Sequence, residues 1–139
     1  MRILKDLEMA RVLLVDDDLT SRLTLQTVLE AGGYSVDSAA SAAEAFGKME
    51  ERQYELILTE MQMEAPESGL RVLQHARTMK YKPATALVTS SLDSERGGSN
   101  SVLIEAEDVP GLLDQIAGLI GVRASRQVER ELRMAHASS

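Results

Sequence analysis

The chain has 139 residues, which suffices for one domain with its own hydrophobic core. It carries a net charge of −7 and no cysteine, so disulfides and thiolate metal sites are excluded, and binding to nucleic acid is disfavoured because phosphates repel an acidic surface. No apolar run approaches the roughly 20 residues of a membrane-spanning helix, and the first ten residues mix charges where a secretory signal needs an apolar segment. We therefore expect a cytoplasmic protein.

The first part of the chain alternates between strand and helix patterns. Residues 11–15 (RVLLV) predict a strand buried on both faces, followed by a run of aspartates. Residues 19–31 have apolar positions at helical spacing, and two glycines then end this helix. Residues 34–39 alternate as a weaker strand. Ser41 and Glu44 form a capping box, which predicts a helix to about residue 53.

The second part repeats the alternation. Residues 56–59 (LILT) predict the third strand, and a loop containing Gly69 leads to a helix at about residues 70–79. Residues 85–88 and 102–104 predict the fourth and fifth strands. Between them, residues 91–101 are polar and rich in glycine and serine, so we expect the helix at this place, the fourth, to be short or missing.

The last predicted helix begins near residue 109, with Asp108 as its cap and Pro110 in its first turn. Its apolar residues form a one-sided stripe that ends near Gly121. We divide the chain into an N-terminal extension at 1–10, a domain at 11–122 and a C-terminal helical extension or tail at 123–139.

Apolar strands that alternate with amphipathic helices indicate parallel βα units, and hence a doubly wound, three-layer α/β sandwich. Ligand chemistry in such sheets lies at the carboxyl ends of the strands. The residues expected there are Asp16, Asp17, Asp18, Glu60, Thr89 and Glu105.

Four segments, in order, carry a resemblance to a known family: VLLVDDD at 12–18, YELILTEMQM at 54–63, LVTS at 87–90 and the helix at 109–121. Together they resemble the receiver domain of two-component response regulators over about residues 11–121. The resemblance implies a flavodoxin-like (CheY-like) fold with five parallel strands in the order 2-1-3-4-5. It also implies a role in phosphorelay signal transduction.

The resemblance assigns a role to each acidic or hydroxyl position. In that family an acidic pair holds Mg²⁺, an Asp accepts the phosphoryl group, and a Thr or Ser and a Lys bind its oxygens. By position, Asp16 and Asp17 match the acidic pair, and Thr89 matches the switch hydroxyl. Glu60 stands where the phosphoacceptor Asp belongs and could assist weak Mg²⁺ binding. Glu105 stands where the Lys belongs.

These two departures oppose phosphorylation. Exchanging Asp for Glu60 moves the carboxylate by about 1 Å, which can cost about 100-fold where in-line geometry matters. Glu105 replaces a cation by an anion, and two such charges about 4 Å apart repel by about 4 kcal/mol at an effective dielectric of 20. We therefore predict a degenerate receiver that is not an enzyme, requires no cofactor, and binds a signalling protein (a histidine kinase or an output protein) without phosphorylation. Homodimerisation is left open.

Two other functions and several structural interpretations stay open. The chain could be a phosphorylatable receiver with an unusual Glu phosphosite, or a small-ligand domain on a flavodoxin-like sheet. Asp18 is expected to cap the helix that follows it. Glu60, Thr89 and Glu105 could be ordinary strand-end residues, and His75 is expected on a helix surface.

Overall fold

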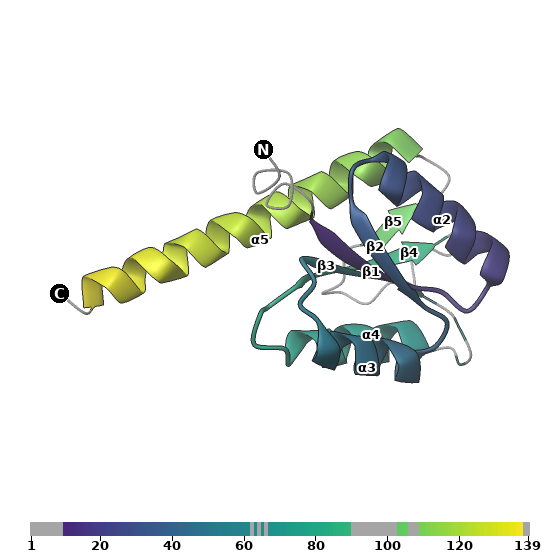
Figure 1. The fold of residues 1–139 in the computed structure, drawn as a ribbon, viewed down its shortest axis with the longest axis horizontal. Helices are drawn as coiled ribbons and strands as arrows, with labels where there is room; N and C mark the ends of the chain where they lie inside the picture. Colours follow the sequence, from purple (N-terminus) through teal and green to yellow (C-terminus); the bar gives the residue numbers. More distant parts are fainter. Residues whose placement is uncertain are drawn as a thin grey trace.

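The computed structural model describes residues 10–61, 63, 65, 67–89, 103–105 and 109–137. Five parallel strands form one sheet in the order β2-β1-β3-β4-β5, which confirms the predicted fold class (Figure 1). The strands are β1 (Arg11–Val15), β2 (Ser35–Ala39), β3 (Leu56–Glu60), β4 (Ala84–Thr89) and β5 (Leu103–Glu105). The helices are α2 (Leu19–Ala31), α3 (Ala42–Glu51), α4 (Ser68–Arg77) and α5 (Val109–Ala137).

Helices cover both faces of the sheet (Figure 1). Successive side chains of a strand point to opposite faces, so the apolar run of β1 divides between two cores. Val12 and Leu14 pack with α2 and α5, whereas Leu13 and Val15 pack with α3 and α4. All four are fully buried, and each contributes roughly 1.5–3 kcal/mol through removal of its side chain from water. This explains why β1 has no polar position.

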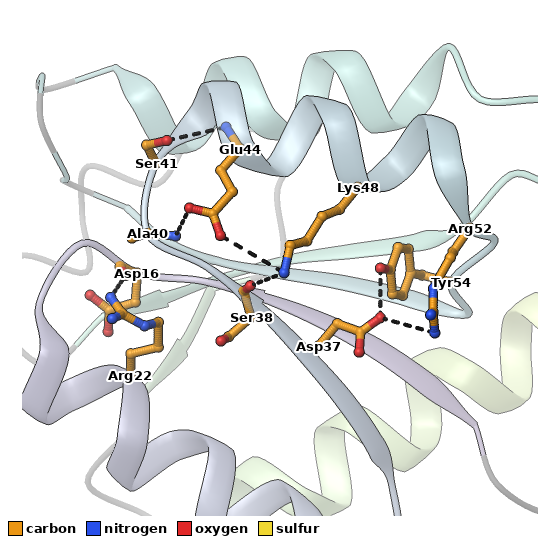
Figure 2. A network of polar contacts seen from close by, with 10 residues as sticks. All are labelled: Asp16, Arg22, Asp37, Ser38, Ala40, Ser41, Glu44, Lys48, Arg52 and Tyr54. Carbon is orange, nitrogen blue, oxygen red and sulfur yellow. Dashed lines mark hydrogen bonds and ion pairs between the residues drawn. The ribbon is translucent and has the colours of Figure 1, made fainter.

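Local signals set the starts of α2 and α3. Asp18 caps α2, and its Oδ2 accepts a hydrogen bond of 2.8 Å from the main-chain N–H of Ser21, as predicted. Ser41 caps α3 through a 3.1 Å hydrogen bond from the N–H of Glu44, and Glu44 reaches back to the N–H of Ala40 (Figure 2). These contacts confirm the predicted capping box.

The prediction for α4 was shifted by two residues. The helix begins at Ser68, not at residue 70, because Gly69 lies inside the first turn. A Cβ at Gly69 would lie 2.8 Å from the main-chain oxygen of Met61 and would collide with that of Glu60. Glycine is therefore required by close packing of α4 against the end of β3, and not by a loop conformation.

The last helix is longer than its apolar stripe suggested. It continues without a break through Gly118 and Gly121 to Ala137, and its second half leaves the body of the domain (Figure 1). The division of the chain at residues 10 and 122 stays a prediction. The expected short or missing fourth helix and the cap at Asp108 lie outside the described residues. None of the described helices is long and apolar enough to cross a membrane.

Candidate functional site

The carboxyl ends of the strands bring the five predicted site positions to one edge of the sheet. Val15 pairs with Thr59, so Asp16, directly after β1, and Glu60, the last residue of β3, lie side by side. Glu60 pairs with Val88, the residue before Thr89. The last pair of the β4–β5 ladder joins Thr89 to Glu105. The backbone thus gathers positions 16, 17, 60, 89 and 105, as the parallel topology requires.

Asp16 is held rigidly at this edge. It is 1% exposed, and its main-chain N–H donates a 3.0 Å hydrogen bond to the carbonyl oxygen of Ala39. Its Oδ1 accepts a 3.0 Å hydrogen bond from the N–H of Asp18. Its Oδ2 is buried and accepts no hydrogen bond from the described residues. A buried carboxylate oxygen without a donor is costly, and it is available to a cation.

Arg22 is the cation that approaches this acid, but it binds the main chain. Its Nη1 donates a 2.7 Å hydrogen bond to the carbonyl oxygen of Asp16, and not to the carboxylate (Figure 2). The sequence analysis did not identify Arg22. Its position in the sequence could have indicated this contact. Arg22 lies one helical turn after the cap Asp18, from where a long side chain reaches back over the start of α2.

The surroundings of Glu60 disfavour its ionised form. Burial, followed by the negative charges of Asp16 and Asp17, raises the pKa of its carboxyl from 4.5 to about 7. A hydrogen bond with the main chain of Met61 acts in the opposite direction. No lysine or arginine of the described residues is among the causes of the shift. Near neutral pH the Glu60 carboxyl is therefore about half protonated.

The carboxylate oxygens at this edge are of the type that Mg²⁺ prefers, but those of the described residues do not form a complete metal site. Magnesium prefers carboxylate oxygens, and Asp16 Oδ2 lacks a donor while Glu60 is destabilised as an anion. A cation here would relieve both. However, nowhere in the described ranges do three or more acidic or histidine side chains converge closely enough to hold a metal ion. Among the described residues, the site thus offers carboxylates from adjacent strands and not a complete set of ligands.

Polar contacts along β2 fasten α3 and the residues before β3 to it. Lys48 Nζ donates a 2.7 Å hydrogen bond to the carbonyl oxygen of Ser38 (Figure 2). Tyr54 donates a 2.8 Å hydrogen bond to Asp37 Oδ2, and burial raises the pKa of the Tyr54 hydroxyl. Arg52 lies 3.9 Å from the same oxygen. Lys48, Tyr54 and Arg52 therefore bind residues of β2 and not the acids of the edge.

His75 was expected on a helix surface, and it is half-buried on the side of α4 that faces α3. Its ring centroid is 4.5 Å from that of Phe46. Its Nε2 is buried and has no hydrogen-bond partner among the described residues. The helix faces α3 at this point, so position 75 belongs to the interface between the two helices. This packing does not suggest a catalytic role.

Comparison with known proteins agrees with this architecture. The family model for the response regulator receiver domain matches residues 12–109. The gliding motility regulatory protein of Myxococcus xanthus is 37% identical over 108 residues, which are 70% of this chain and 13% of that protein. The transcriptional regulatory protein CpxR homolog of Haemophilus influenzae is 33% identical over 88 residues, which are 63% of this chain and 38% of that protein. The chain thus spans well under half the length of these relatives.

Solved structures give the same picture. The response regulator protein TrrA from Thermotoga maritima, in complex with Mg(2+)-BeF, is 26% identical with a TM-score of 0.69, covering 80% of this chain and 99% of that one. The receiver domain of a sensor histidine kinase from Pseudomonas aeruginosa, with a magnesium ion coordinated in its active site cleft, has a TM-score of 0.70. It is 21% identical and covers 81% of this chain and 98% of that one.

Proposed function

Because the chain belongs to the response regulator receiver family of two-component systems, we propose that it is a degenerate member that binds its protein partner without phosphorylation. Receiver domains in general are signalling modules that interact with histidine kinases and output domains, and not enzymes in their own right. One observation carries the proposal. Glu60, which we assign to the phosphoacceptor position, has a pKa raised to about 7 by burial and by neighbouring acids.

Electrostatics supports this proposal. Phosphoryl transfer needs positive charge on the transferring group and an ionised nucleophile. Glu60 is about half protonated at neutral pH, and its negative neighbours Asp16 and Asp17 would repel an incoming phosphoryl group. Each like-charge pair at about 4 Å is worth about 4 kcal/mol at an effective dielectric of 20. Position 105, which we assign to the family's lysine, is a glutamate in this chain and would add negative charge in place of positive charge.

Weak Mg²⁺ binding forms part of the proposal. Asp16 and Glu60 would hold the ion, with Asp17 beside them, and no ion is required for the docking role. Bound Mg²⁺ supplies neutralising charge for phosphoryl oxygens. In this chain it would mainly relieve the repulsion between Asp16 and Glu60, and would lower the pKa of the Glu60 carboxyl.

The proposal includes the cellular location of the domain and its binding partners. We expect it to act in the cytoplasm, to bind a histidine kinase or an output protein, and to make no direct contact with nucleic acid. The net charge of −7 supports the last point. The chain could be joined to further domains, as the relatives that it matches are much longer.

Labelling with a small phosphodonor tests the proposal. The chain is incubated with acetyl phosphate and Mg²⁺, and intact mass spectrometry measures the added phosphoryl group. We expect no labelling of the native chain, and labelling of the double variant Glu60→Asp, Glu105→Lys. Stoichiometric acyl phosphate on Glu60 of the native chain would establish the alternative, a receiver with an unusual Glu phosphosite.

A further inference from the structure

A groove lies at the opposite end of the sheet from the acidic edge. It has a volume of about 630 Å³ and runs between the end of α4, the first residues of β4 and the middle of α5. Ala84 and Thr85, which open β4, line it, whereas Glu60 pairs with Val88 near the other end of that strand. At about 3.3 Å per residue, the groove and the acidic edge are more than about 10 Å apart. They can therefore bind different partners.

The charge of this groove is opposite to that of the whole chain. Ten residues line it, five of them cationic and none acidic, in a protein with a net charge of −7. The cationic residues are Arg77, Lys82, Arg123, Arg126 and Arg130. They come from α4, from the loop before β4 and from α5, so the fold assembles the charge from distant parts of the sequence.

One of these cations is fixed in place. Arg123 donates hydrogen bonds of 3.0 Å from Nε to the carbonyl oxygen of Lys82 and 2.8 Å from Nη2 to that of Tyr81. Carbonyl oxygens are neutral acceptors, so the guanidinium keeps its positive charge. Lys82 has a φ of +48°, which is unusual for a residue with a side chain, and its carbonyl oxygen faces Arg123 of α5. The contacts hold α5 against the loop and define one wall of the groove.

The floor of the groove is apolar. Pro83, Leu119 and Val122 line it beside the cations, and Val122 is 50% exposed. On α5 the lining residues recur at positions 119, 122, 123, 126 and 130, which is one face of a helix. This face extends for about 16 Å, the length of three helical turns. An apolar strip with arginines along it matches a ligand that has apolar side chains flanked by carboxylates.

We propose that this basic groove binds an acidic amphipathic helix of a partner protein. The apolar side chains of that helix would lie on Pro83, Leu119 and Val122, and its Asp and Glu side chains would pair with Arg126 and Arg130. Charge complementarity selects this occupant. Nucleic acid matches it less well, since a phosphate backbone has no apolar face to cover the floor and the lining has no aromatic ring on which bases could stack.

A binding measurement with a defined probe tests this site. The probe is a fluorescein-labelled 16-residue peptide with leucines along one helical face and glutamates elsewhere, and fluorescence anisotropy measures its affinity for the full chain. We expect Arg126→Glu with Arg130→Glu to weaken binding by about tenfold or more, and raised salt to weaken binding to the native chain. Both arginines are exposed, so the fold is retained, which circular dichroism checks.

The matched control reverses two exposed arginines outside the groove, Arg52→Glu with Arg71→Glu, which changes the net charge equally. It should keep the affinity within about twofold, because charges separated by more than about 10 Å are largely screened. An equal loss in this control would mean unspecific attraction and would overturn the proposal.

Two further probes complete the test. A peptide of the same composition with its leucines scattered around the helix should bind about tenfold more weakly, and equal binding would refute the role of the apolar floor. Tighter binding of a 15-nucleotide single-stranded DNA, lost in the same groove variant, would overturn the proposal in favour of nucleic acid. Acetyl phosphate labelling of Glu60 would contradict the proposed function but not this groove, so the two proposals fail separately.

Discussion

The acidic edge of the sheet and the groove beside the amino end of β4 bear opposite charge and hold it in different ways. At the carboxyl ends of the strands, the acids are buried: Asp16 is 1% exposed, and burial raises the pKa of Glu60 to about 7. At the amino end of β4, the cations Arg126 and Arg130 stand on the exposed rim of a groove. Buried acids have a fixed position and a desolvation cost, whereas exposed cations adapt to a ligand at little cost. The acidic end is therefore the rigid one, and the basic end is suited to docking.

The largest expected effect concerns the rigidity of the acidic end. Gly69→Ala should destabilise the fold by about 3 kcal/mol, because the new Cβ would meet the main-chain oxygens of Glu60 and Met61. Urea unfolding measures the change. Gly118→Ala is the control, since a Cβ there meets nothing within 4 Å in the exposed part of α5, and it should stabilise by about 0.5–1 kcal/mol. Equal effects of the two substitutions would show that the end of β3 is not closely packed.

A second prediction tests whether the acidic end is destabilised by its own charge. The pKa of Glu60 is about 7 in the folded chain against an ordinary 4.5, so the fold binds an additional proton between these values. The stability from that proton is fully present below pH 4.5 and is lost as the pH rises through 7. We expect a loss of about 1–2 kcal/mol over this window, allowing for partial solvent exposure of the carboxyl.

Glu60→Gln should remove this pH dependence, and Mg²⁺ should weaken it in the native chain by stabilising the ionised form. Urea unfolding at a series of pH values measures both effects. Glu44→Gln on the exposed side of α3 is the control and should leave the slope unchanged. If the slope persisted in Glu60→Gln, another group would have to be responsible, and the account of a repulsive acidic end would be wrong.

The difference between the two ends also explains what the sequence predicted. The acidic end follows from local patterns: a buried apolar run such as residues 11–15 predicts a strand, and the topology brings the acids after each strand to one edge. The bounds of α2 and the caps at Asp18 and Ser41 have equally local causes. These features needed only hydrophobic periodicity and helix-capping residues.

The basic end could not be predicted in this way. Arg77, Lys82 and Arg123 are separated by up to 46 positions, and only the packing of α5 against the loop before β4 places them together. Taken singly, they are ordinary surface cations. Gly69 and Arg22 were missed for a related reason, since their roles depend on where α4 and α2 meet the ends of β3 and β1. The roles of these residues depend on tertiary packing, which no local sequence pattern indicates.

The smallest expected effect distinguishes two kinds of arginine within the basic end. Arg123→Met should destabilise the fold by about 1 kcal/mol, because it removes hydrogen bonds to the carbonyl oxygens of Tyr81 and Lys82. Arg126→Met removes the same charge from an exposed position and should change stability by less than about 0.5 kcal/mol. Urea unfolding measures both changes in stability.

Since each variant lacks one groove cation, both should weaken binding of the acidic peptide. A cost at Arg126 equal to that at Arg123 would mean that the rim of the groove is part of the structural framework, and the contrast between a rigid acidic end and an adaptable basic end would then fail.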